Sequence, residues 1–220
     1  MFAESPLGCQ IFSRSWNLWY NSTCMDIVFG THVDLVRPFP VEQTTRVWGW
    51  MQCFRSTTLH DDSVMDPDAY NTHAAALAEA GLAYAIIDKN NLVGSDVAAP
   101  LVGIVAFEPG SPGNVYIHIA TSRKCAGAYR RSGVSLVDEA VGLACSDMFE
   151  RFDDLRRISA IIVDTNHLVQ GLARRVGFAL EGRLADWFTQ NGIPHDALHY
   201  GLTRFLPQEE NADVVHEESD

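Results

Sequence analysis

The segment of residues 114–142 constrains the fold most strongly, because it joins a buried strand to a helix through a basic, glycine-containing turn. Residues 115–120 form an apolar run rich in β-branched side chains, which predicts a buried strand. From residue 134 to residue 150, apolar side chains recur at every third or fourth position, which predicts an amphipathic helix. A strand followed by a helix favours an α/β fold, although the connection at residues 121–129 is longer than usual.

The turn between this strand and this helix has the properties of an anion-binding site. The unpaired N–H groups and the macrodipole at a helix start favour a negative charge. Glycine in the turn lets the backbone approach a bulky ligand, and the neighbouring Arg123 and Lys124 add positive charge. The sequence therefore predicts a phosphate-binding turn made of Arg130, Arg131, Ser132, Gly133, Val134 and Ser135.

Composition and charge exclude several classes of protein. The 220 residues carry a formal net charge of −12, which argues against nucleic-acid binding and favours a cationic substrate, although an acidic surface can equally serve solubility. No apolar run reaches the roughly 20 residues of a membrane span, and the N-terminus has no secretory pattern. Five cysteines without C-x-x-C spacing predict reduced thiols, hence a cytoplasmic protein, and no residue cluster has metal-ligand spacing.

Strand and helix signals elsewhere complete a mixed α/β pattern. Strands are predicted at residues 31–37, 82–87, 100–108, 157–163, 178–189 and 195–205, and helices at 41–54, 67–80 and 167–176. Gly81 and Gly177 are placed to end helices, and Asn191-Gly192 is a hairpin signal. Residues 1–30 are expected to be an N-terminal extension (packed on the domain, an extra strand or hairpin, or a subunit contact), residues 31–206 the main domain, and residues 207–220 an acidic mobile tail.

Two motifs on these elements match a known pattern. Arg130-x-x-Gly133-x-Ser135 is similar to a Q/R-x-x-G-x-G/A pyrophosphate loop, and about 30 residues further on, Asn166-x-x-Val169-x-x-Leu172-Ala173-x-x-x-Gly177-Phe178 is similar to N-x-x-A-x-x-L-Y-x-x-x-G-F. Residues 31–205 thereby resemble the GNAT superfamily of acyl-CoA-dependent N-acyltransferases, particularly the branch that acetylates ribosomal-protein N-termini. The resemblance implies a mixed, mostly antiparallel sheet that is splayed between two parallel strands and flanked by helices.

The same resemblance implies a site for acetyl-CoA as acyl donor. Backbone N–H groups of residues 131–135 would hold the pyrophosphate of coenzyme A. The main chain at Ile119, Ala120 and Thr121 would pair with the pantetheine arm, and one of its N–H groups would polarise the thioester carbonyl. Asn166 would hydrogen-bond the pantetheine or order the cleft, which lies where the parallel strands splay at their C-terminal ends.

Acyl transfer to an amine needs a base and an acid. Imidazole is the side chain suited to a base near neutral pH, so His118 is the candidate, and its alternative role is that of a hydrogen-bonded core histidine. The tyrosine that serves as acid in many GNAT enzymes falls on Ala173, which cannot donate a proton. Tyr200 is the candidate replacement, with plain packing as the alternative, and Glu108 could act through a water.

We therefore expect direct transfer of an acetyl group from acetyl-CoA to a primary amine, with a protein or peptide N-terminus as the first choice of acceptor. A small cationic amine is the alternative acceptor, and the acidity disfavours amines of nucleic acids. The absence of a G-x-S-x-G elbow argues against a hydrolase. A catalytically silent acyl-CoA-binding module stays open because of Ala173, as does assembly into a homodimer.

Overall fold

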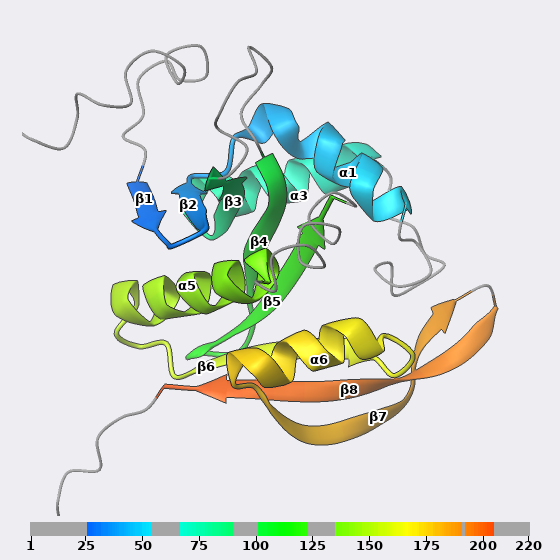
Figure 1. The fold of residues 1–220 in the computed structure, drawn as a ribbon. Helices are drawn as coiled ribbons and strands as arrows, with labels where there is room; N and C mark the ends of the chain where they lie inside the picture. The colour runs from blue at the N-terminus through cyan, green and yellow to red at the C-terminus, as the bar shows by residue number, and fades with distance from the viewer. Residues whose placement is uncertain (1–25, 54–66, 90–100, 123–134, 191, 205–220) are drawn as a thin grey trace, which may run out of the picture.

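The computed structural model describes residues 26–53, 67–89, 101–122, 135–190 and 192–204. These residues form one mixed sheet with the strand order β1-β2-β3-β4-β5-β6-β8-β7, and helices cover its two faces (Figure 1). The strands are β1 (Asp26–Phe29), β2 (Val33–Arg37), β3 (Ala83–Asp88), β4 (Leu101–Pro109), β5 (Asn114–Thr121), β6 (Arg157–Val163), β7 (Ala179–Gln190) and β8 (Ile193–Thr203). The helices are the 3-10 helix η1 (Val41–Gln43), α1 (Thr44–Cys53), α3 (Pro67–Glu79), α5 (Leu136–Arg151) and α6 (His167–Val176).

The order of elements predicted from the sequence is confirmed from β2 onward. The additional strand β1 lies inside the predicted N-terminal extension and pairs antiparallel with β2, so the extra-strand alternative holds for residues 26–29. Residues 1–25 and 205–220 lie outside the described ranges, so the rest of the extension and the acidic tail stay predictions. None of the helices in the described ranges has the length and apolar character that a membrane span requires.

One pair of neighbouring strands departs from the antiparallel pattern. β5 and β6 run parallel, and their register covers only the three pairs from Asn114–Arg157 to Tyr116–Ser159. Beyond that point residues 117–121 pair with β4, and residues 160–163 pair with β8, while the two strands diverge (Figure 1). The splayed, mostly antiparallel sheet expected from the sequence is therefore confirmed.

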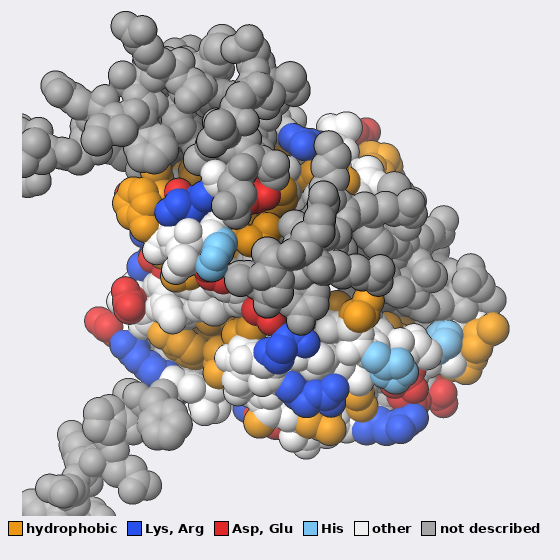
Figure 2. Space-filling model, in the orientation of Figure 1, with side chains coloured by type: hydrophobic (Ala, Val, Ile, Leu, Met, Phe, Trp, Pro, Cys, Tyr) orange, Lys and Arg blue, Asp and Glu red, His pale blue; other side chains and the backbone are white. Residues whose placement is uncertain are grey.

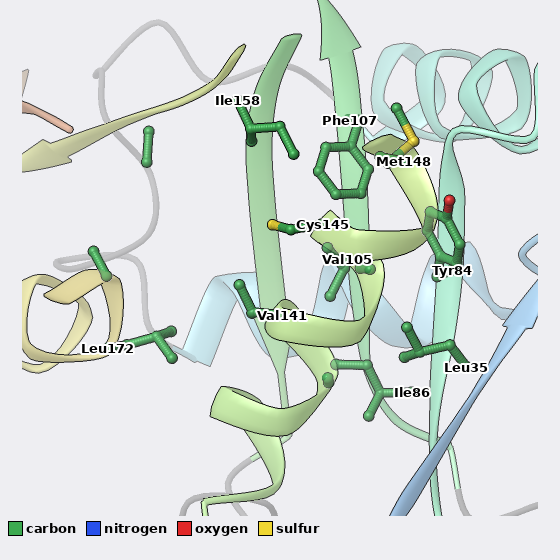
Figure 3. Close-up of a cluster of buried hydrophobic side chains, with 14 of the residues drawn as sticks. Leu35, Tyr84, Ile86, Val105, Phe107, Val141, Cys145, Met148, Ile158 and Leu172 are labelled. Carbon is green, nitrogen blue, oxygen red and sulfur yellow. The ribbon is translucent and has the colours of Figure 1, made fainter. Parts of the chain in front are cut away.

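The core consists of two apolar layers, one on each face of the sheet. α5 and α6 cover one layer, and α1 and α3 cover the other. Figure 3 shows side chains of α5, among them Val141, Cys145 and Met148, packed on Val105 and Phe107 of β4. Full burial of a side chain such as Phe107 contributes about 1.5–3 kcal/mol. This packing holds α5 firmly against the strands beside the splay.

The ends of α6 follow the capping pattern predicted from the sequence. The Asn166 side chain accepts a hydrogen bond from the N–H of Val169 at 3.3 Å and so caps the helix start. Gly177 ends the helix with φ of 101°, a left-handed conformation that favours glycine. The predicted C-cap at Gly177 is confirmed.

Candidate active site

The opening between β5 and β6 exposes one edge of β5. The N–H of Ser122 donates to the carbonyl of Val102 on β4 at 2.8 Å. Backbone groups of an antiparallel strand alternate between its two sides, so Ile117, Ile119 and Thr121 direct theirs toward the opening. Among the described strands, none pairs with this edge of β5 beyond Tyr116. The edge therefore offers N–H and C=O groups to an extended, amide-containing ligand.

The predicted pantetheine-binding residues divide into two groups on this strand. Ile119 and Thr121 face the opening with their main chains, as the prediction requires. Ala120 instead turns its N–H and C=O toward Ile104 of β4 and buries its methyl group in the layer under α1 and α3. Pairing with a ligand stays a prediction for Ile119 and Thr121.

The predicted phosphate-binding turn precedes α5. Arg130, Arg131, Ser132, Gly133 and Val134 lie outside the described residues, and Ser135 is the N-cap of α5. The Ser135 hydroxyl accepts from the N–H of Asp138 at 3.1 Å and donates to the Asp138 carboxylate at 2.6 Å. Ser135 thus defines where the helix starts, and the positive end of the helix macrodipole lies at this point.

The first turn of α5 carries two carboxylates that would repel a phosphate if they were unpaired. Asp138 binds the Arg175 guanidinium, which comes from the last turn of α6. Glu139 binds the N–H groups of Thr31 and His32 and the His32 ring, all in the turn between β1 and β2. Both charges are therefore engaged by cations or N–H donors.

The ionisation of Glu139 reflects this environment. Partial burial raises the pKa of the carboxyl group, but the hydrogen bonds from His32 and Thr31 outweigh burial and hold the pKa below its usual value. The basic side chains over α6, on the same face of the sheet as α5, are arginines, among them Arg174 and Arg175 of its last turn (Figure 2). The surroundings of the α5 N-terminus are therefore compatible with an anion in an otherwise acidic chain.

His118 lies on the opposite face of the sheet, in the part of β5 that has left β6. It pairs with Ala106, which is buried under α1 and α3, and its Nε2 atom is 3.1 Å from Oε2 of Glu108. The His118 and Glu108 side chains are 49% and 45% exposed. His118 is therefore hydrogen-bonded to a neighbour, as the alternative role expects, but its side chain is accessible and does not belong to the core.

Glu108 is ionised in this arrangement. The hydrogen bond from His118 lowers the pKa of Glu108, burial opposes it, and the charges of His118 and His73 of α3 lower it further. An ionised carboxylate only accepts hydrogen bonds. The pair is therefore an imidazole N–H donating to a carboxylate on the neighbouring strand.

Tyr200 is fully buried in the layer under α5 and α6, which also contains Ala173. On the sheet it lies opposite Ala160, the first β6 residue beyond the last β5 pair. Its hydroxyl has no hydrogen-bond partner within the part of the chain that the structure describes. A buried hydroxyl group without a hydrogen-bond partner destabilises the folded state by about 1–3 kcal/mol. Packing therefore accounts for the burial of the Tyr200 ring but gives no reason for its hydroxyl group.

A polar cluster at the end of β6 contains Asp164 and Asp196, which the sequence offers as residues of the acceptor groove, and adds Arg183 and His195, which it does not single out. Arg183 of β7 binds the carboxylates of Asp196 and Asp164, and Nδ1 of His195 lies 4.0 Å from Asp164. The β7–β8 and β6–β8 pairings together bring these side chains into contact. Strand alternation alone would not have found them, because the β7–β8 register shifts between Leu184 and Phe188 and Asp164 lies outside the hairpin.

A hollow lined by described residues lies away from the strand opening. It has a volume of about 530 Å³ and lies between α5 and the end of β8, with Cys145, Phe149, Val176 and Leu202 in its lining. Burial raises the pKa of Cys145 to about 12, so this thiol stays protonated and is a poor nucleophile. Geometry and chemistry therefore point to the strand opening rather than to this hollow.

Comparison with known proteins rests on structure alone. No protein-family model and no curated protein sequence matches the chain. RimL, a ribosomal L7/L12 alpha-N-protein acetyltransferase, matches with a TM-score of 0.61 and 19% identity over 84% of this chain and 98% of that one. An acetyltransferase (GNAT family) from Bacillus anthracis matches with a TM-score of 0.59 and 15% identity over 81% of this chain and 98% of that one.

A probable GNAT-family acetyltransferase from Chromobacterium violaceum covers more of the chain, with a TM-score of 0.56 and 21% identity over 92% of this chain and 96% of that one. The protein thus has the GNAT fold, as the sequence motifs predicted. RimL has also been solved in complex with coenzyme A, and that structure matches with a TM-score of 0.61 and 19% identity over 81% of this chain and 98% of that one.

Proposed function

We propose that this protein is an acetyl-CoA-dependent N-acetyltransferase that transfers the acetyl group directly to a primary amine. The observation that carries the proposal is the opening between β5 and β6, which directs the main chains of Ile119 and Thr121 toward a gap in the sheet. The GNAT fold supports it, as does the coenzyme A complex of RimL, a protein of the same fold.

The donor would enter from the face covered by α5 and α6. The turn of residues 130–135 would hold the pyrophosphate at the start of α5, where the macrodipole favours negative charge. The edge of β5 at Ile119 and Thr121 would pair with the amides of the pantetheine arm. Arg175 binds Asp138, and the β1–β2 turn donates hydrogen bonds to Glu139. These contacts support this placement, because they compensate two negative charges that would otherwise repel the pyrophosphate.

The acceptor amine would enter from the opposite face, where His118 lies. His118 would take a proton from the amine, whose nitrogen then attacks the thioester carbonyl carbon. A main-chain N–H at the β5 edge would stabilise the oxyanion. The C–S bond then breaks, and the Tyr200 hydroxyl would give its proton to the departing thiolate, which leaves as free coenzyme A.

A protein or peptide N-terminus is the favoured acceptor. RimL, which shares the fold, is an alpha-N-protein acetyltransferase, and this likeness supports a similar acceptor here. A small cationic amine is the second candidate, favoured by the net charge of −12 and by the carboxylates of Asp164 and Asp196 at the end of β6. A silent acyl-CoA-binding module is the third, favoured by Ala173 at the family's tyrosine position.

The test is release of free thiol from acetyl-CoA by the purified chain. Peptides with free N-termini, the same peptides with blocked N-termini, and small polyamines form the three acceptor arms. Thiol release with free peptides but not blocked ones supports the favoured acceptor, and release with polyamines alone supports the second. Binding of coenzyme A without release of free thiol in any of the three arms would support the third candidate, a catalytically silent acyl-CoA-binding module.

A further inference from the structure

The His118–Glu108 pair joins two strands in a defined orientation. Glu108 lies opposite Tyr116 and His118 lies opposite Ala106, so the two side chains are diagonal neighbours on the same face of the β4–β5 pair. It is the Nε2 atom of His118 that lies at 3.1 Å from Glu108. The orientation of the ring therefore distinguishes its two nitrogen atoms.

The carboxylate determines which of these nitrogen atoms carries the proton. Glu108 is ionised, so it can accept a hydrogen bond but cannot donate one. Nε2 of His118 must then be the protonated nitrogen, and in the neutral ring Nδ1 holds the free lone pair. Only a nitrogen with a free lone pair can take a proton from an amine.

We propose that Glu108 is a positioning residue that holds His118 in the Nε2–H tautomer and thereby makes Nδ1 the atom that accepts the proton of the acceptor amine. This role rests on the proposed acetyl transfer. Once His118 has taken the proton, the adjacent carboxylate also stabilises the imidazolium, as the aspartate does in hydrolase triads.

The stability of the fold does not explain why His118 and Glu108 are paired. Both side chains are close to half exposed, and ion pairs at such positions are weak because water and salt screen them. The contact is nevertheless made between side chains on two rigid strands rather than on a loop. His73 of α3 also contributes to the electrostatic lowering of the Glu108 pKa. The arrangement thus keeps an ionised acceptor beside the imidazole.

The kinetic test uses Glu108→Gln, with Glu79→Gln on the exposed side of α3 as the matched control. An amide can donate as well as accept, so it no longer selects one tautomer. We expect kcat to fall at least about 10-fold, with the KM values for acetyl-CoA and for the amine unchanged. The control variant should have the wild-type kcat.

The spectroscopic test does not depend on turnover. In protein labelled with ¹⁵N-histidine, the His118 signals, assigned by their loss in His118→Gln, should show a protonated Nε2 and an unprotonated Nδ1 at neutral pH. Glu108→Gln should shift them toward a mixture of tautomers. A protonated Nδ1 in the neutral wild-type ring would overturn the positioning role.

The outcomes separate the two proposals. An active wild type whose Glu108→Gln variant keeps full kcat overturns the role of Glu108 and leaves acetyl transfer standing. A wild type without transfer to any amine overturns the acetyl transfer and this role with it. Loss of kcat together with loss of tautomer selection supports both.

Discussion

Arg175 in the last turn of α6 binds Asp138 in the first turn of α5, with Nε 2.6 Å from Oδ2 and Nη2 3.0 Å from Oδ1. The same Asp138 carboxylate also accepts a hydrogen bond from Ser135, the N-cap of α5. A cation from one helix therefore compensates the carboxylate nearest to the start of the other. The Arg175–Asp138 pair therefore influences how strongly an anion binds at the start of α5.

Removal of this cation should weaken coenzyme A binding. In Arg175→Ala the charge of Asp138 is no longer compensated, and two charges a few ångströms apart in water interact by about 1 kcal/mol, which is about fivefold in Kd. Calorimetric titration with coenzyme A measures the change. Asp138→Asn in the same background should restore the affinity, and failure to restore it would mean that Arg175 contacts the ligand itself.

Replacement of His118 should remove the base without damaging the fold. We expect His118→Gln to lower turnover at neutral pH about 100-fold, the lower end of the usual contribution of a general base. Because the side chain is half exposed, the thermal unfolding midpoint should not change. Steady-state rates and a thermal melt test this, and an unchanged rate would exclude His118 as the base.

Tyr200→Phe separates a catalytic hydroxyl from a packing ring. It removes a buried oxygen that has no partner among the described residues, so stability should be unchanged or should rise. If the hydroxyl protonates the thiolate, kcat should fall about 100-fold. Urea unfolding and kcat measured on the same sample provide the comparison, and full activity would leave Tyr200 with a packing role only.

Tyr84→Phe is the matched control for that experiment. The Tyr84 hydroxyl donates to Asp147 at 2.7 Å and accepts from Arg151 at 2.9 Å, so its loss removes two hydrogen bonds to charged, partly buried side chains. We expect a loss of about 1–3 kcal/mol in the free energy of unfolding. Tyr84→Phe should therefore lower the free energy of unfolding, whereas Tyr200→Phe should not.

Glu139 should make stability depend on pH in the acidic range. The pKa of its carboxyl group is lower in the folded state than the usual value of 4.5, so the contribution is complete above about pH 4.5 and is lost as pH falls through the folded value. Urea unfolding at pH 7 and pH 4 tests this. Glu139→Gln should be less stable than the wild type at pH 7 and should lose less on acidification, and an equal loss would contradict the assignment.

Local patterns determined most of the fold in advance. The alternation and periodicity of apolar residues, together with Asn166 and Gly177 as helix caps, predicted the elements within a few residues of their observed ends. The two motifs predicted the splayed sheet. These features are local in the chain, because backbone geometry and capping depend on residues within one turn or one strand.

The sequence also proposed His118 and Tyr200, but it could not assign their surroundings. It left His118 open as a core residue, whereas the β4–β5 register places it beside Glu108 on an accessible face. It gave no indication that the Tyr200 hydroxyl has no partner among the described residues, that Arg175 compensates Asp138, or that Ala120 turns its main chain away from the opening.

What the sequence determined by itself is therefore the order and type of the elements and the residue types at the site. What only the tertiary structure decided is which side chains meet and which backbone edge is open. The reason is physical: strand register and helix packing join residues that are ten to more than a hundred positions apart, such as Glu108 with His118 and His32 with Glu139. No local pattern in the chain encodes those distances.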